Sequence, residues 1–121
     1  MHKSRFCALV IDFPDGELDA AARFWAAALG REFAGTDGNY AKLKTGDDEP
    51  IMLLQKVDHP PRVHLDIEAD DVDAEVARLE RLGAKRLNKV QTWWVMEAPT
   101  GHRFCVVRPQ RGPLDDRANT W

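Results

Sequence analysis

Apolar and polar residues along this chain follow two periods, one typical of strands and one typical of helices. The strand-like segments are residues 6–11, 31–34, 40–45, 51–57, 62–68, 85–90, 93–97 and 104–107. Two other segments repeat apolar residues every three or four positions, which predicts helices that begin near Glu17 and after residues 69–71. Gly30 and Gly83 stand where helix C-caps belong. The tail from residue 109 has no regular pattern, although we expect Trp121 to dock on the surface.

The order of elements is repeated in the two halves of the chain. Asp66 follows Asp12 by 54 residues, and Gly83 follows Gly30 by 53. Between the halves, residues 58–61 contain two prolines, which cannot join a ladder. One helix and about four strands in each half predict a βαβββ module used twice. One module alone would leave one face of its sheet open, so two modules must pair.

The length and composition fit a single globular domain covering residues 1–121. Within it we expect module one at about 5–57, a linker at 58–61, module two at about 62–108 and a C-terminal tail at 109–121. Hydrophobic residues make up 44% of the chain and charged residues 31%, with a net charge of −3, which excludes a disordered chain.

The distribution of charged and apolar residues limits the partners and the location. Lys and Arg are scattered, so we expect no nucleic-acid partner. No apolar run approaches the roughly 20 residues of a membrane span, and no signal-peptide region is visible, so we expect no membrane partner and a cytoplasmic location. Cys7 and Cys105 lack a CxxC spacing, and we expect buried reduced thiols, with a bridge between them left open.

Four motifs in order carry a resemblance to a known superfamily. They are Ala-Arg-Phe-Trp at 22–25 with Leu29-Gly30, Val-His-Leu-Asp at 63–66, Asp-Asp-Val at 70–72 with Leu-Gly-Ala at 82–84, and residues 98–105. Over about residues 6–108 the chain resembles the vicinal oxygen chelate superfamily of glyoxalases, bleomycin-resistance proteins and extradiol dioxygenases, and most of all bacterial glyoxalase-like domains. The resemblance implies an α+β fold of two βαβββ modules that form curved mixed sheets around a shared cavity, and a homodimer.

For metal-dependent members, the resemblance implies ligands on the first and last strand of each module. His64 matches the opening position of module two, and Cys105 matches its closing position, where a thiolate would suit zinc better than magnesium, manganese or nickel. The opening position of module one falls at Ala8 or Val10, and neither can bind a metal. In the fourth region only Gln55 offers a weak donor. Because a catalytic metal normally takes at least three protein ligands, we expect no cofactor, with a divalent metal on His64 and Cys105 as the alternative.

The strand around His64 has a polar side. Strand alternation places His64, Asp66 and Glu68 on one face, and we expect His64 to be hydrogen-bonded there, by Asp66 or by a backbone group. Asp66 could equally be structural. Trp93 and Trp94 must point to opposite faces, one toward the cavity and the other under a helix or at a surface.

These observations predict a metal-independent small-molecule-binding protein with an apolar or aromatic ligand. The expected ligand contacts are His64, Asp66, Gln55, Met52, Leu54, Trp94 and Cys105. The alternative is an enzyme. It would be a lyase, isomerase or dioxygenase with a divalent metal and a reduced ligand set, or a metal-free enzyme in which His64 is the general base.

Overall fold

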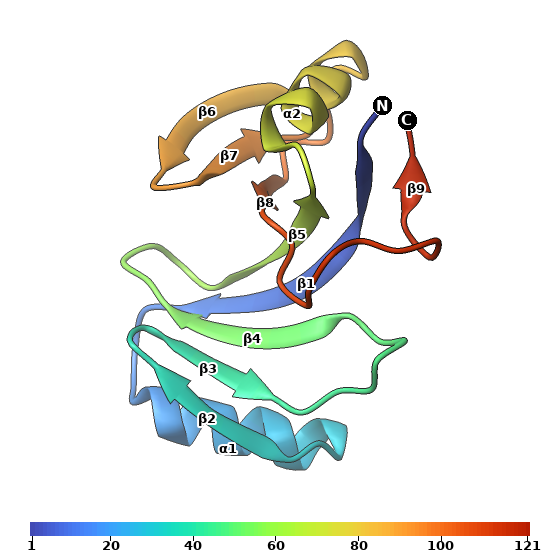
Figure 1. Ribbon diagram of the computed structural model, residues 1–121. Helices are drawn as coiled ribbons and strands as arrows, with labels where there is room; N and C mark the ends of the chain where they lie inside the picture. Colours follow the sequence, from blue (N-terminus) through green and yellow to red (C-terminus); the bar gives the residue numbers. More distant parts are fainter. The chain divides into compact units, whose positions relative to one another are not determined.

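The structure, a computed structural model, describes residues 1–121 throughout. It contains two helices and nine strands (Figure 1). In chain order they are β1 (Lys3–Phe13), α1 (Leu18–Leu29), β2 (Phe33–Asp37), β3 (Tyr40–Leu43), β4 (Ile51–Lys56), β5 (Arg62–Ala69), α2 (Val72–Arg81), β6 (Lys85–Val90), β7 (Trp93–Glu97), β8 (Arg103–Val107) and β9 (Asn119–Thr120). Apart from β9, this order reads βαβββ twice, so the predicted α+β class and the repeated module are confirmed.

The strands form one mixed sheet. Its hydrogen-bonded order is β2-β3-β4-β1-β5-β8-β7-β6, and β9 pairs with β1. The pairs β1–β4 and β5–β8 are parallel, and the hairpin neighbours are antiparallel. The chain folds as two compact units: unit 1 holds Met1–Cys7 with Leu65–Trp121, and unit 2 holds Ala8–His64. The boundaries therefore fall inside β1 and inside β5.

The core of unit 2 lies between α1 and its strands, and Figure 1 shows α1 alongside β2 and β3. Its buried residues are Ala22 and Ala26 of α1, Ala41 and Leu43 of β3, and Leu54 of β4. Alanine favours the helix and lets it lie close to the sheet. Gly30 closes α1 as predicted, because its φ of 67° is a left-handed conformation that glycine adopts without strain.

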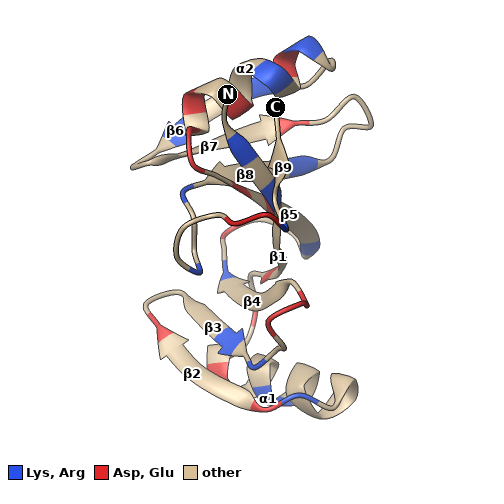
Figure 2. Ribbon diagram, turned by 45° about the vertical axis from the view of Figure 1, so that its right-hand side comes forward, with Lys and Arg blue, Asp and Glu red and all other residues tan.

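The core of unit 1 is built in the same way under α2. Val76 and Leu79 of α2 pack with Ala69, Met96 and Val106 from three strands. Asp71 caps the helix by accepting a hydrogen bond from the Ala74 N–H at 3.0 Å, and Figure 2 shows residues of both charges along α2. Neither α1 nor α2 is long and apolar enough to cross a membrane.

Two predicted strands differ from the structure in their bounds by more than two residues or in their register, and one strand was not predicted. β1 covers residues 3–13 rather than 6–11, because Lys3 and Ser4 pair with β9 and residues 8–13 pair with β4. β2 covers 33–37 rather than 31–34, since it forms a tight hairpin with β3. β9 was not predicted, because its two residues have strand conformation only through pairing with β1 at the other end of the chain.

A buried carboxylate ties both ends of the chain to α2. Glu75 is fully buried and accepts hydrogen bonds from Arg78 at 2.8 and 2.9 Å, from the Ser4 hydroxyl at 2.7 Å and from His2 Nε2 at 2.8 Å. Burial alone would raise the pKa of Glu75, but these hydrogen bonds overcome it and hold the pKa at about 2. The ionised carboxylate therefore stabilises the folded state.

The pH dependence of stability should report this network. A carboxyl group whose pKa falls on folding stabilises above its unfolded pKa and loses that effect as the pH falls through its folded pKa. The unfolding free energy should therefore decrease between pH 4.5 and 2, with about 3 kcal/mol of the decrease due to Glu75. Glu75→Gln should flatten this part of the profile in urea-unfolding measurements. Glu17→Gln, at an exposed position before α1 whose side chain makes no capping hydrogen bond, is the control and should keep the profile; equal slopes in both variants would contradict the assignment.

Candidate functional site

Each strand of unit 1 turns one row of side chains toward α2 and the other away from it. On β5, Ile67 and Ala69 pack against the α2 core, so Asp66 and Glu68 lie on the opposite face. On β8, Val106 belongs to that core, and Cys105 therefore shares the face of Asp66, with which it pairs in register. The face opposite α2, which we call the inner face of unit 1, is defined by Asp66, Glu68, Cys105, Trp93 and Val95. Polar and apolar groups lie side by side on it.

In unit 2 a histidine is held by a buried aspartate. His64 Nδ1 donates a hydrogen bond to Asp12 Oδ2 at 2.7 Å. Asp12 is almost completely buried, and His59 Nε2 lies 3.8 Å from the same oxygen. A proton on Nδ1 leaves Nε2 of the neutral ring as an acceptor, so Asp12 sets both the orientation and the tautomer of His64. The sequence led us to expect Asp66 or a backbone group in this role; the Nδ1 partner is Asp12.

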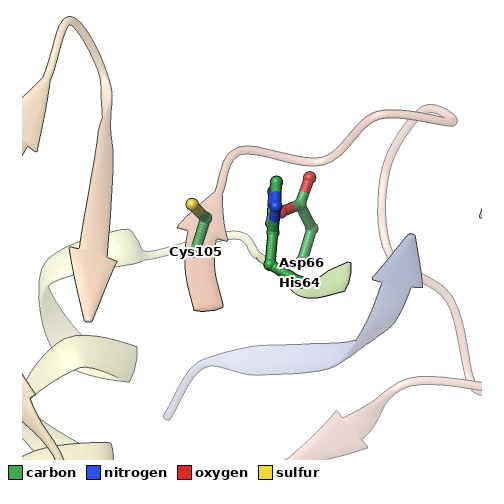
Figure 3. Close-up of side chains that lie close together, drawn as sticks. All are labelled: His64, Asp66 and Cys105. Carbon is green, nitrogen blue, oxygen red and sulfur yellow. The ribbon is translucent and has the colours of Figure 1, made fainter. Parts of the chain in front are cut away.

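His64 and Asp66 stand two residues apart on β5, next to Cys105 on β8 (Figure 3). One potential ligand atom from each residue lies within 4.8 Å of the others, and all three residues are partly buried. An imidazole, a carboxylate and a thiol are the ligand types that zinc accepts. The sequence predicted His64 and Cys105 as the pair for a metal, and the structure adds Asp66 to them.

The metal site of the superfamily needs donors from both modules, and the residues of module one do not supply them. Ala8 and Val10 of β1 are apolar and buried. Gln55 of β4 pairs in register with Asp12 and offers only an amide. Asp12 itself is engaged with His64. The matched positions of module one therefore do not fit a four-ligand site of that kind, whereas His64, Asp66 and Cys105 form a group that could hold an ion.

Three of the predicted contact residues lie in hydrophobic cores. Leu54 is buried in the core of unit 2, and Met52 packs against the same core, whereas Gln55 lies on the opposite face of β4. In unit 1, Trp94 packs against the core under α2, and Arg86 lies over its ring at 5.0 Å. Trp93 is therefore the member of the Trp pair on the inner face. Strand alternation required the two Trp rings to lie on opposite faces, but only the packing against α2 showed which ring lies on which face.

The functional residue that the sequence analysis missed is Asp12. The repeat already marked this residue, since Asp12 and Asp66 occupy equivalent corners of the two modules. What the repeat could not show is that Asp12 lies within hydrogen-bonding distance of His64, 52 positions along the chain.

Two βαβββ modules in one chain, with a histidine on the opening strand of the second, define a protein of the vicinal oxygen chelate type. Residues 8–107 match the family described as a glyoxalase-like domain, and the chain belongs to that family. This confirms the resemblance found in the sequence. No curated protein matches the chain.

Solved structures share the fold at low sequence identity. A hypothetical protein from Bacillus halodurans superposes with a TM-score of 0.70 at 11% identity, covering 93% of this chain and 99% of that one. The Mn(II)-bound glyoxalase from Novosphingobium aromaticivorans gives 0.61 at 23% identity, over 96% of this chain and 44% of that one. Methylmalonyl-CoA epimerase from Streptomyces coelicolor gives 0.63 at 20% identity, over 86% and 96%. These likenesses establish the fold.

The tautomer of His64 can be tested directly. With neutral imidazole, the hydrogen bond to Asp12 should keep the proton on Nδ1, visible in long-range ¹H–¹⁵N correlation spectra of the ring. Asp12→Ala removes the acceptor, so the spectrum should move toward the Nε2–H form that free imidazole prefers. Asp66→Ala is the matched control and should leave the Nδ1–H form in place. A tautomer change in the control alone would show that Asp66 orients the ring.

Proposed function

We propose that this chain is a metal-independent small-molecule-binding protein in which His64 makes the principal polar contact with the ligand. The observation that carries the proposal is the hydrogen bond between His64 Nδ1 and buried Asp12. A histidine held in one orientation and one tautomer presents a fixed acceptor at Nε2. Pre-organisation of this kind lowers the entropy lost when a ligand binds.

The surroundings of His64 support a ligand with both a polar and an apolar part. Asp66 and Cys105 lie beside it, and the inner face of unit 1 continues from Cys105 to Val95, its partner in register on β7. Trp93 adds an aromatic ring on the same face of that strand. The positions of module one that match metal donors fall at Ala8 or Val10, which have no donor atom, and at Gln55, which has only an amide, so the metal site of the superfamily does not account for His64. A direct contact between His64 and the ligand does.

A ligand screen tests this function. We expect a compound from a set of small hydroxylated aromatics and oxoacids to raise the melting temperature of the purified protein. At a hundred times its dissociation constant, a ligand adds about 2.7 kcal/mol of stability. His64→Ala should abolish the shift, because the Nε2 acceptor is lost. His102→Ala is the control, since His102 is exposed and its ring bonds to the neighbouring Thr100 hydroxyl. A shift that survives His64→Ala would contradict the role of His64.

A second candidate is a metal-dependent lyase, isomerase or dioxygenase, and the cluster in Figure 3 favours it. His64, Asp66 and Cys105 would hold the ion, with Asp12 as the carboxylate that orients the histidine from behind, a common arrangement around metal sites. The ion would supply Lewis-acid chemistry. Without an ion, the Nε2 atom of His64 could act as a general base, which is the metal-free form of the enzyme alternative.

Metal analysis separates the two candidates. Protein purified without added metal should contain far less than one equivalent of zinc, manganese, iron or nickel by mass spectrometry, because the first module lacks donors. Protein incubated with a small excess of zinc and then dialysed should again contain far less than one equivalent of zinc. One retained equivalent that is lost in His64→Ala and in Cys105→Ser, but kept in His102→Ala, would overturn metal independence in favour of the second candidate.

A further inference from the structure

The C-terminal segment outside the family match runs as a strap along unit 1. The strap, residues 108–121, leaves the end of β8 and returns to the N-terminal end of β1, so that the two chain ends lie together (Figures 1 and 2). There β9 pairs Thr120 with Lys3 and Asn119 with Ser4. The family match ends at residue 107, so the strap is a feature of this chain beyond the shared domain.

The strap contacts Arg5, which lies next to the fully buried Glu68 and two residues before the fully buried Cys7. Asp115 of the strap lies 3.8 Å from Arg5 Nη1, while Arg5 Nη2 lies 3.4 Å from Glu68 Oε1. Burial and the neighbouring Glu68 carboxylate raise the pKa of the Cys7 thiol, whereas the charge of Arg111, also in the strap, acts in the opposite direction. Asp115 is therefore linked through Arg5 to buried Glu68, and strand alternation places Cys7 on the same face of β1 as Arg5.

Little apolar surface holds the middle of the strap in place. Between residues 109 and 118, only Ala118 is buried. The ion pair between Arg117 and Asp115 is within the strap and exposed, and exposed pairs add little stability. Segments with few buried apolar contacts open at lower free energy than the whole domain unfolds.

The closed strap also leaves a polar atom of Arg5 unsatisfied. Arg5 Nε is buried and has no hydrogen-bond partner, although the same guanidinium lies beside Asp115 of the strap. A buried polar atom without a partner destabilises the state that contains it, because water would solvate it. Opening the strap beside Arg5 would offset part of the cost of opening.

The end of the strap is held more firmly than its middle. The Trp121 indole N–H donates to Ser4 Oγ at 2.8 Å, and its backbone N–H donates to the His2 carbonyl at 2.9 Å. The Arg78 guanidinium lies 3.7 Å from the centre of the Trp121 ring, within the range of a cation–π contact. Through Ser4 and Arg78, this tryptophan is joined to buried Glu75.

We propose that residues 108–121 form a lid that opens over Cys7 and Glu68 while the rest of unit 1 stays folded, and that Trp121 is its latch. The proposal is independent of which molecule His64 binds and of whether a metal is present. It makes the accessibility of Cys7 a direct measure of the open state.

Thiol labelling tests the lid. In a Cys105→Ser background Cys7 is the only cysteine, and its reaction with Ellman's reagent can be followed at a fixed pH in increasing urea. Below the unfolding transition the labelling rate should depend only weakly on urea, since little surface is exposed by local opening. Adding Trp121→Ala should raise the rate about tenfold or more, and Trp121→Phe, which keeps the ring but not the indole N–H, should give an intermediate rate.

A matched variant separates lid opening from loss of stability. Arg86→Ala removes an ion pair with Glu80 and the contact over Trp94 in the same unit, without touching the strap. It should leave the labelling rate of Cys7 in the absence of urea within about twofold. Two results would refute the lid, because each would mean that only global unfolding exposes Cys7. One is that Arg86→Ala accelerates labelling as much as Trp121→Phe. The other is that the labelling rate in the Cys105→Ser protein rises with the full urea dependence of global unfolding. If Trp121→Ala does not fold, the urea dependence of Cys7 labelling in the Cys105→Ser protein still tests the lid.

Discussion

The structure depends on one constraint: each half of the sheet packs only one face against its helix. Alternate residues on β5 and β8 pack under α2, and alternate residues on β4 pack under α1. The remaining positions, on the opposite face, hold buried apolar residues such as Ala8 and Val10 as well as polar groups. Asp66 and Cys105 lie at such positions, and this is why a family with a repeated and conservative architecture can hold very different chemistry. Fold alone does not specify that chemistry.

On the face of the sheet away from the helices, the hydrogen bond between His64 and Asp12 is the interaction that matters most for function. A buried aspartate is costly unless it is hydrogen-bonded or paired, and His64 supplies the partner. The same arrangement could orient a ligand contact, a metal ligand or a base. The first module bears on the choice among these uses, since the position at which the resemblance implies a metal donor falls at Ala8 or Val10, and both are apolar.

The two ends of the chain contribute more than the repeat implies. Residues 1–7 and 108–121 lie outside the matched family region, yet His2, Ser4 and Trp121 surround the buried Glu75–Arg78 pair of α2. Unit 1 is thus completed by residues from both termini. The end of the strap at Trp121 is firmly held, whereas its middle is polar and exposed. We therefore expect local motion in the middle of the strap.

Much of the fold followed from the sequence, because it depends on local periodicity and on a repeat that is visible along the chain. The two helices, the glycine that closes α1 and the strands of both modules are determined by patterns within a few residues of each other. The candidate site was only partly predictable for the opposite reason. His64, Asp66 and Cys105 could be named from their positions. Strand alternation, however, could not show which of Trp93 and Trp94 faces α2, or that Met52 and Leu54 face α1. The hydrogen bond from His64 to Asp12 and the pairing of β9 with β1 join residues far apart in the chain. The sequence by itself therefore determined the elements and their order, whereas the tertiary structure alone decided which faces are buried and which distant side chains meet, because both depend on packing in three dimensions.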